Sequence, residues 1–221
     1  MIFLATSFTP EYKYANLYIK TLNMYCNIPF TALEIGKDIN SCGMPNNILQ
    51  AGHFLDHIPK EAKTIIFTDA DFLMHRPFDQ DELTFLKELK EGEISACPNM
   101  HPDQMYAEEA NVLSPRKLLE GFDDVRVFNT GFIACRSETY HNIFNKFQIL
   151  WDEFDLAFAH YAKIQLCICA AVHKLNIKWI QTPGHLCSHG HWGMQPWKNV
   201  VLGTPPTFNG RIIALDHRLT F

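Results

Sequence analysis

The sequence predicts an α/β domain with a mostly parallel central sheet that is flanked by helices. Short runs of apolar and β-branched residues alternate along the chain with longer segments in which apolar residues recur at helical spacing. One run, residues 64–68 (TIIFT), is continuously β-branched or aromatic, as expected of a strand buried on both faces of a parallel sheet. The chain has 221 residues, which suits one domain with a continuous core.

The first half of the chain is expected to begin with a strand at residues 2–5, followed by a polar turn at residues 6–10. A helix should start after Pro10, because apolar and aromatic side chains recur at helical spacing from residue 14 to residue 22. Further strands are expected at residues 30–35, 64–68 and 94–97, and further helices at residues 45–58 and 81–90.

The second half is expected to contain two more strands and two more helices before a tail rich in His, Gly, Pro and Trp. The strands are expected at residues 131–135 and 177–180, and the helices at residues 137–154 and 158–175. Residues 98–125 are polar and irregular, so a loop is expected there. The sequence contains no repeat, low-complexity tract or evident linker, which indicates one domain over residues 1–221.

The composition argues against several classes of protein. The net charge is −5 and the basic residues do not cluster, so a nucleic-acid-binding role is not expected. No stretch approaches the ~20 apolar residues that span a bilayer, and residues 1–6 lack the positive leader of a signal peptide. The seven cysteines are scattered without a CxxC pair, which indicates a reducing compartment. Together these observations favour a cytoplasmic location.

Asp69 and Asp71 follow the strand expected at residues 64–68 directly, with only Ala70 between them. In open α/β sheets ligands bind beyond the carboxyl ends of the strands, so both carboxylates should face one ligand. Two such carboxylates can hold Mg²⁺ or Mn²⁺ while phosphate oxygens complete the shell of the metal. The metal would neutralise a diphosphate and stabilise it as a leaving group. The alternative is an acidic turn that caps a helix.

Residues 64–74 (TIIFTDADFLM) resemble the signature of GT-A glycosyltransferases, in which a hydrophobic strand precedes a DxD motif. More narrowly, they are similar to the family 8 group, which includes glycogenin-like and bacterial galactosyltransferase-like enzymes. The resemblance implies a GT-A fold with a Rossmann-like nucleotide-sugar-binding half at residues 1–97 and an acceptor-binding half at residues 98–221. It implies that Asp69 contacts ribose and metal, and that Asp71 is a direct metal ligand. The implied activity is Mn²⁺- or Mg²⁺-dependent transfer of a hexose or deoxyhexose from a UDP-sugar donor to an oligosaccharide or glycan acceptor.

The start of the chain also resembles family 8. Residues 4–7 (LATS), with Tyr12, are similar to the first strand and the uridine-binding loop of that group. The resemblance implies that Thr6 and Ser7 line the nucleotide pocket and that Tyr12 stacks on the base. The alternative for Tyr12 is a core aromatic residue on a helix face.

Two other stretches are assigned to the donor sugar by the same resemblance. Residues 128–132 (FNTGF) resemble the FNxG segment, where Asn129 and Gly131 border the sugar; an ordinary turn that opens a strand is the alternative. Family 8 enzymes retain the configuration of the sugar, and a Gln of the helix before their last strand lies near the anomeric carbon. Residues 163–165 (KIQ) resemble that place, so Gln165 and Asn129 are the candidate catalytic residues. The alternative for Gln165 is an edge-of-core residue bonded to backbone.

An inverting reaction would instead need a general base, usually a carboxylate, near the acceptor hydroxyl. Four aspartates are candidates, and local sequence distinguishes none of them: Asp103, Asp152, Asp155 and Asp216.

Residues 189–197 (HGHWGMQPW) resemble the C-terminal HxxGxxKPW motif of family 8. Counted back from the final Pro-Trp pair, His189 falls on the metal-binding histidine and Gln195 on the phosphate-binding lysine. A one-residue deletion would align His191 with that histidine instead. Two carboxylates and an imidazole make a reasonable Mn²⁺ site. Because the lysine is missing, the chain is expected to be a divergent member of the group.

Three other kinds of site or function stay open. A structural zinc site could use four alternating residues, His185, Cys187, His189 and His191. A phosphatase of the haloacid-dehalogenase type also uses a strand followed by DxD, although its motif normally lies in the first strand. A non-catalytic module that binds nucleotide-sugar or carbohydrate could stack sugars on tryptophans, of which the chain has Trp151, Trp179, Trp192 and Trp197.

Overall fold

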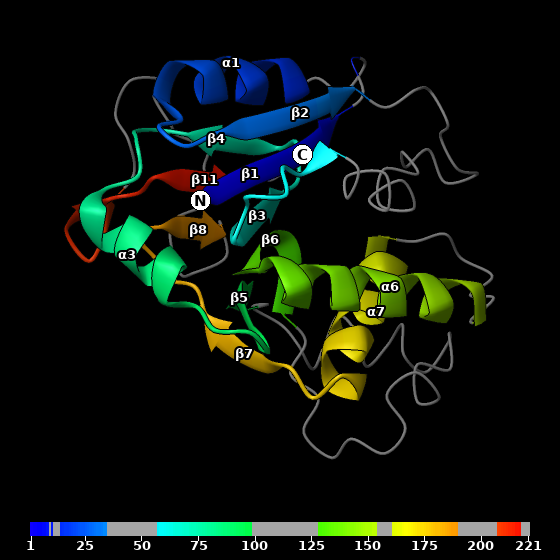
Figure 1. Cartoon of the computed structure of the whole chain (residues 1–221). Coiled ribbons are helices and arrows are strands. Elements are labelled where there is room, and N and C mark those ends of the chain that lie inside the picture. The colour runs from blue at the N-terminus through cyan, green and yellow to red at the C-terminus, as the bar shows by residue number, and fades with distance from the viewer. Residues whose placement is uncertain are drawn as a thin grey trace.

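A six-stranded sheet forms the centre of the molecule (Figure 1). Its strands, in spatial order, are β2 (Phe30–Glu34), β1 (Ile2–Phe8), β3 (Thr64–Thr68), β6 (Phe128–Arg136), β5 (Glu93–Pro98) and β7 (Lys178–Gln181). The pairs β1–β2, β1–β3 and β5–β7 are parallel, whereas β6 is antiparallel to both β3 and β5. The expected mostly parallel sheet is therefore confirmed, with one reversed strand.

The computed structural model describes residues 1–8, 10, 14–34, 57–98, 128–153, 161–189 and 207–217. The helix expected at residues 45–58 and the loop expected at residues 98–125 lie almost entirely outside these residues. Among the described helices, none is both long enough and apolar enough to cross a membrane.

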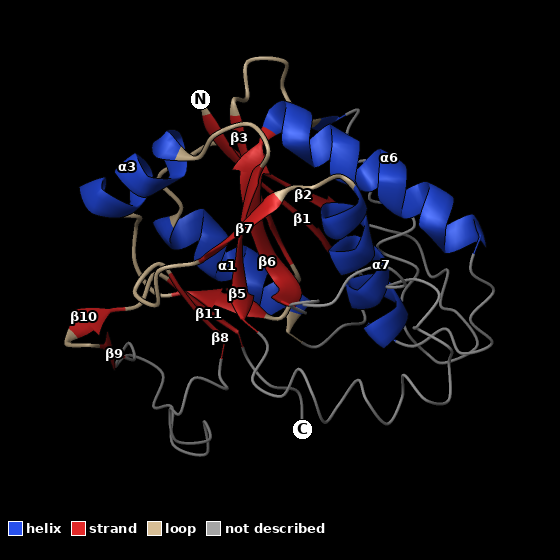
Figure 2. Cartoon of the chain, turned by 90° about the horizontal axis from the view of Figure 1, so that it is seen from below, coloured by secondary structure: helices blue, strands red, loops and turns tan. Residues whose placement is uncertain are grey.

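Helices cover both faces of the sheet (Figure 2). On one face lie α6 (Ser137–Glu153) and α7 (Tyr161–Lys174), and on the other lie α1 (Ala15–Tyr25) and α3 (Gln80–Glu88). Side chains of β3 alternate between two cores: Ile65 and Phe67 pack on the side of α6 and α7, and Ile66 packs on the side of α1. All residues of β3 are buried, which confirms the expectation of a strand covered on both faces.

A second sheet, which the sequence pattern did not predict, lies on the α1 side. It consists of β4 (Phe72–Met74), β11 (Leu215–His217) and β8 (Cys187–His189), in the order β4-β11-β8. β11 is antiparallel to β4 and parallel to β8. Apolar side chains from all three strands join the core on the α1 side. Strands of three residues are too short for an alternating pattern to stand out, so periodicity could not reveal them.

Two strand boundaries differ from the sequence expectation in ways that matter for the site. β1 continues to Phe8, so the expected polar turn is wrong for Thr6 and Ser7, which are buried strand residues. β6 begins at Phe128, three residues before the expected start at Gly131, and therefore includes Asn129 and Thr130. The register of β6 against β5 shifts at this segment. The turn that the sequence suggested is therefore an irregularity inside a strand.

A short hairpin near the C-terminus is made by β9 (Thr207–Phe208) and β10 (Arg211–Ile212). Its turn residues, Asn209 and Gly210, both have positive φ, at 49° and 77°. A type I′ turn requires this geometry, and the pair Asn-Gly favours it. This dipeptide is a sequence signal for a hairpin that the expectations above did not use.

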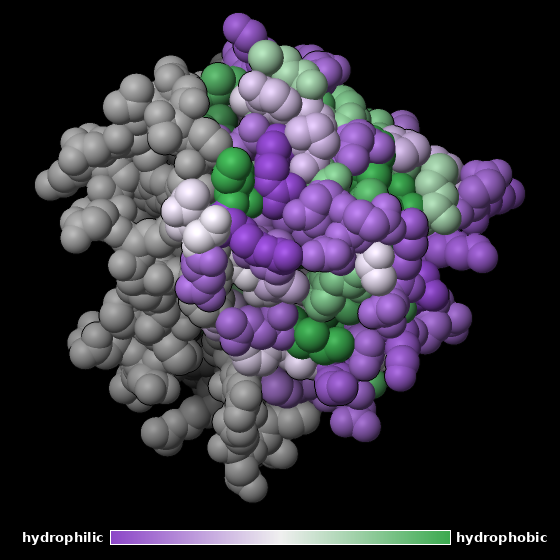
Figure 3. Space-filling model, turned by 90° about the vertical axis from the view of Figure 1, so that its left-hand side faces the viewer, coloured by the Kyte–Doolittle hydropathy of each residue, from purple (hydrophilic) through white to green (hydrophobic). Residues whose placement is uncertain are grey.

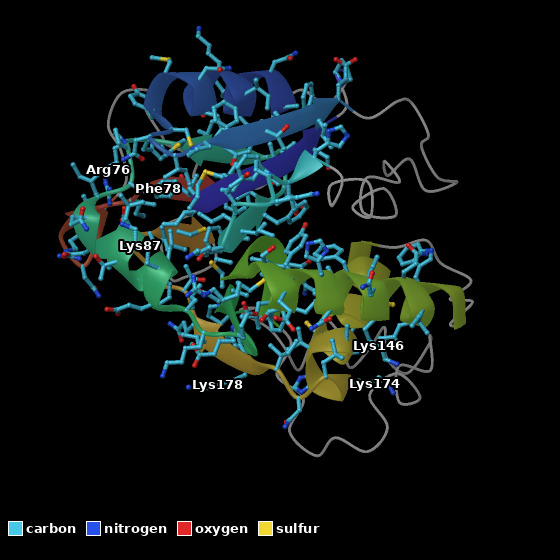
Figure 4. All side chains as sticks on the ribbon, viewed as in Figure 1. Arg76, Phe78, Lys87, Lys146, Lys174 and Lys178 are labelled. Carbon is cyan, nitrogen blue, oxygen red and sulfur yellow. The ribbon has the colours of Figure 1, made fainter. Side chains whose placement is uncertain are left out.

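Arg76 joins the start of α3 to this hairpin through an ion pair with Glu82 and a hydrogen bond to Ile212. α3 begins with a capping box, in which the side chains of Asp79 and Glu82 each accept a hydrogen bond from the other residue's N–H. Arg76, which precedes α3 (Figure 4), donates to both carboxylate oxygens of Glu82, at 2.6 and 2.9 Å, and to the Ile212 carbonyl at 2.7 Å. The Glu82 side chain is fully buried, whereas that of Arg76 is 20% exposed. Arg76 therefore compensates a buried charge and holds β10 against α3.

The side of the molecule that carries α3 is mainly hydrophilic (Figure 3). The apolar patches in this view are small and separated, and the labelled side chain of Lys87 points outward (Figure 4). Such a surface gives no indication of an apolar binding face there.

Candidate functional site

The acidic pair lies in the short turn that joins β3 to β4. β3 ends at Thr68, the turn is Asp69–Asp71, and β4 begins at Phe72. The alternative of an acidic turn that caps a helix is wrong, because a strand follows the pair. Both aspartates are partly exposed, and the Oδ1 atom of Asp71 is buried. The turn leaves the carboxyl end of β3, which is the edge where α/β sheets bind ligands.

Asn129 and Gly131 of β6 lie directly beside Asp69. Because β6 is antiparallel to β3, the start of β6 meets the end of β3. The Asp69 N–H donates to the Gly131 carbonyl at 2.9 Å, and the Gly131 N–H donates to Asn129 Oδ1 at 2.8 Å. A Cβ atom at Gly131 would lie 3.1 Å from Asp69 Oδ2 and 3.0 Å from Asn129 Oδ1. The site residues predicted on these two strands are therefore in contact.

Gln165 approaches the same segment from α7. Its side chain is buried, and Oε1 accepts a hydrogen bond from the Thr130 N–H at 3.3 Å. One turn further along α7, the buried Cys169 thiol donates to the Phe128 carbonyl at 3.6 Å. The reading of Gln165 as an edge-of-core residue bonded to backbone fits this contact. The hydrogen bond between Gln165 and Thr130 also attaches α7 to the segment that carries Asn129 and Gly131.

Thr6 and Ser7 lie near the carboxyl end of β1, beside the end of β3. Both side chains are buried. Thr6 Oγ1 donates to the Thr68 carbonyl at 2.8 Å, so this hydroxyl supports the end of β3. A second hydroxyl, that of Tyr18 in α1, lies 2.6 Å from Thr68 Oγ1. The sequence predicted Tyr18 only as a residue of a helix. The structure places its hydroxyl beside Thr68, the residue before the acidic turn.

The small sheet brings two histidine positions close to the acidic turn along the backbone. β8 ends at His189, which is the Cα partner of His217 in β11. His217 is also the Cα partner of Phe72, the residue that follows Asp71. Sequence reasoning missed His217, although the apolar run at residues 212–215 (IIAL) could have predicted a strand leading to it. The side chains of both histidines, and the predicted residues Tyr12, His191 and Gln195, lie outside the described residues.

The acidic turn carries the type of side chain that divalent metals prefer as a ligand. Asp69 and Asp71 supply carboxylate oxygens, which are the ligands that Mg²⁺ and Mn²⁺ prefer. Gly131 lies close to this carboxylate: a Cβ atom there would be 3.1 Å from Asp69 Oδ2, so any side chain at this position would crowd it. Among the residues whose side chains are described, no group of three His, Cys, Asp or Glu could hold a metal ion. A third protein ligand would have to come from beyond that set.

Two residues of the alternative zinc site, His185 and Cys187, have side chains that the structure describes, and each contacts a different neighbour. His185 Nε2 lies 3.1 Å from Arg211 Nη1. Burial raises the pKa of the Cys187 thiol well above its usual value, and the neighbouring Cys97 raises it further.

Of the four candidate bases for an inverting reaction, the structure describes one side chain, that of Asp216. This side chain is fully buried in β11, with Oδ2 at 3.4 Å from His75 Nε2. A general base must reach the acceptor hydroxyl, so a buried carboxylate is poorly suited to the role. The side chains of Asp103, Asp152 and Asp155 lie outside the described residues.

A cavity of about 780 Å³ lies at the opposite edge of the sheet, beside the start of β3 and the end of β6. Its lining mixes basic side chains, among them Lys63 and Arg136, with the acidic side chains of Glu88, Glu91 and Glu138. None of the site residues predicted from the sequence lines it. This cavity is therefore separate from the acidic turn.

No protein-family model matches the sequence, and no curated protein matches it. Solved structures do match the fold. An active-site mutant of LgtC is similar with a TM-score of 0.57 and 13% identity, over 99% of this chain and 87% of that chain. The galactosyltransferase LgtC in complex with donor and acceptor sugar analogs gives 0.55 and 12%, over 99% and 87%. The apo form of mouse xyloside xylosyltransferase 1 gives 0.54 and 9%, over 98% and 97%. The chain thus has the fold of GT-A glycosyltransferases, as the sequence resemblance predicted.

Proposed function

We propose that this chain, which has a GT-A glycosyltransferase-like fold, is a metal-dependent glycosyltransferase. It transfers a sugar from a UDP-sugar donor to a saccharide acceptor with retention of configuration. The observation that carries the proposal is the contact between the acidic turn and the start of β6, where the Asp69 N–H meets the Gly131 carbonyl at 2.9 Å. This contact supports the proposal because it brings the turn that carries Asp69 and Asp71 beside an amide and a glycine, at the edge where α/β sheets commonly bind ligands.

The acidic turn would hold the metal. In this proposal Asp69 and Asp71 bind Mn²⁺ or Mg²⁺ through their carboxylates, and His189 adds an imidazole. The bound metal would neutralise the diphosphate of UDP as it departs. Gln195, which occupies the position of a lysine in family 8, could donate a hydrogen bond to phosphate but no charge. The metal would therefore neutralise a larger share of the diphosphate charge than in a chain that has the lysine.

The donor would lie across the carboxyl ends of β1, β3 and the start of β6. Residues 1–97 would bind the nucleotide, with Thr6, Ser7 and Tyr12 around uridine. Residues 98–221 would bind the acceptor and contribute Asn129 and Gln165 at the donor sugar. An amide satisfies both donors and acceptors among sugar hydroxyls, and Gly131 allows close approach of the sugar to the backbone.

Turnover of a panel of UDP-sugars tests the proposal. Slow, Mn²⁺-dependent release of UDP that accelerates with an acceptor saccharide would support a glycosyltransferase, and chelation of the metal should abolish it. Nucleotide binding without release under any acceptor would favour the non-catalytic module. Hydrolysis of simple phosphate esters would favour the DxD phosphatase. Each outcome selects one of the three functions.

Replacement of Gly131 by alanine is expected to weaken Mn²⁺-dependent binding of UDP by about tenfold. The new Cβ would press on Asp69 Oδ2 at 3.1 Å and on Asn129 Oδ1 at 3.0 Å, so a carboxylate and an amide must move. Calorimetric titration of UDP in the presence of Mn²⁺ measures the change. Gly92→Ala is the control, since its Cβ would meet no atom within 4 Å. Its φ of +77° strains alanine, so this variant tests whether backbone strain elsewhere in the chain affects UDP affinity. Equal UDP affinity in G131A and the wild type would contradict the placement of the site.

Replacement of His189 by alanine is expected to weaken Mn²⁺ binding by about tenfold, less than loss of a carboxylate, because an imidazole is a neutral ligand. His191→Ala should leave the affinity unchanged. Titration of the free Mn²⁺ signal by electron paramagnetic resonance gives both dissociation constants. If His191→Ala is the harmful change, the alignment with the one-residue deletion is the correct one.

A further inference from the structure

Tyr18 contacts the chain on both sides of the acidic turn. Its hydroxyl lies 2.6 Å from Thr68 Oγ1, in the residue directly before Asp69. Its ring packs against Phe72, directly after Asp71, with ring centroids 6.3 Å apart. The side chain is fully buried. One residue of α1 therefore touches both ends of the three-residue turn that carries the carboxylates.

The end of β3 is fixed by hydroxyl groups rather than by strand pairing alone. Besides the bond to Tyr18, the Thr68 carbonyl accepts a hydrogen bond from Thr6 Oγ1 at 2.8 Å. That carbonyl belongs to the peptide bond between Thr68 and Asp69, so its direction sets where the turn begins. The Tyr18–Thr68 bond fixes the side chain on the same residue. Metal ligands need supporting contacts of this kind to stay within about 0.5 Å of their working geometry.

The Tyr18 hydroxyl is in an environment that keeps its proton on the phenol. Burial raises its pKa far above the usual value for tyrosine, the Thr68 hydrogen bond opposes this, and the nearby charge of Asp71 adds to it. The phenol therefore stays protonated at neutral pH, where its hydroxyl can hydrogen-bond to Thr68.

We infer that Tyr18 is a positioning residue for the metal: through Thr68 and Phe72 it holds the Asp69–Asp71 turn in the geometry that binds Mn²⁺. This inference rests on the proposed function, since it needs a metal at the turn. It adds a residue of α1, outside every motif of the sequence, to the residues that determine metal affinity. Tyr18 itself touches neither metal nor donor.

The test compares Tyr18→Phe with a matched control. Tyr18→Phe removes one hydroxyl and keeps the ring on Phe72. The control is Ser95→Ala, which breaks another buried hydroxyl pair, Ser95 Oγ to Thr182 Oγ1 at 2.9 Å, two strands away from β3. Both variants leave a buried hydroxyl unsatisfied and should lower the melting temperature by about 2–6 °C. Only Tyr18→Phe should weaken Mn²⁺ binding, by about tenfold, and broaden the spectrum of bound Mn²⁺.

A double variant separates positioning from stability. In Tyr18→Phe with Thr68→Val both polar partners are replaced by apolar groups of similar shape, so the melting temperature should recover toward that of the wild type. The Mn²⁺ affinity should stay low, because the hydrogen bond that orients residue 68 in the wild type is still missing.

Two results would overturn the inference, and they differ. Unchanged Mn²⁺ affinity and spectrum in Tyr18→Phe, with normal binding by the wild type, would reduce Tyr18 to a core residue and leave the proposed function standing. Failure of the wild-type chain to bind Mn²⁺ with UDP would remove both the inference and the proposed function.

Discussion

Replacing Asp71 by alanine is expected to weaken Mn²⁺-dependent binding of UDP by more than about 100-fold while the fold stays intact. Asp71 is the second carboxylate of the turn after β3, and in the proposed site it binds the metal directly. Alanine removes a charged oxygen ligand and leaves Asp69 as the one carboxylate of the turn, since Ala70 is apolar. Calorimetric titration of UDP with and without Mn²⁺ gives the loss, and circular dichroism verifies the fold.

Asp81→Ala is the matched control for Asp71→Ala. It removes the same charge from an exposed position on α3, so the change in net charge is the same in the two variants. UDP affinity in D81A should equal that of the wild type. Metal-dependent UDP binding that survives in D71A would count decisively against a metal held by the acidic turn.

Replacing Arg76 by methionine is expected to lower the free energy of unfolding by about 3–5 kcal/mol. The Glu82 carboxylate is fully buried and receives two hydrogen bonds from the guanidinium group, at 2.6 and 2.9 Å. Methionine keeps most of the packing volume but leaves that charge without its cation. The Ile212 carbonyl also loses its donor at 2.7 Å. Urea unfolding followed by circular dichroism measures the loss.

Arg211→Met serves as the control for Arg76→Met. Arg211 pairs with Asp81 at 2.9 Å, but both side chains are more than half exposed. Solvent screens such a pair, so the variant should lose less than about 1 kcal/mol. Equal losses in the two variants would mean that burial of Glu82 does not decide the energy of its ion pair.

The sequence predicted the central sheet well because its signal was strong and local. Residues 64–68 are buried on both faces, and a run without polar interruption is what such burial requires. The reversal of β6 could not be predicted, because periodicity tells a strand from a helix but carries no information on direction. That reversal is what brings Asn129 and Gly131 to Asp69. The motif resemblance put these residues in one site, and the topology supplies the physical reason for their contact.

Sequence reasoning missed the supporting contacts for a different reason. Tyr18 is 50 positions from Thr68 along the chain, and helical spacing explains its burial without any reference to the turn. Arg76 and Glu82 look like ordinary surface charges in a capping sequence, and only the fold reveals that Glu82 is enclosed. Side chains that act through long-range contacts leave no pattern in a single sequence. The roles proposed for Gln195 and His189 remain predictions, since their side chains lie outside the described residues.

The place of β11 between β4 and β8 has a consequence for how the molecule folds. Asp216 of β11 meets His75, next to β4, across 141 positions of the chain, so this small sheet is a contact of very high order. During synthesis β4 and the turn before it leave the ribosome long before their partner strand exists. β4 therefore stays unpaired until the C-terminal segment has been synthesised. We expect the pairing of β11 with β4 to form late in folding.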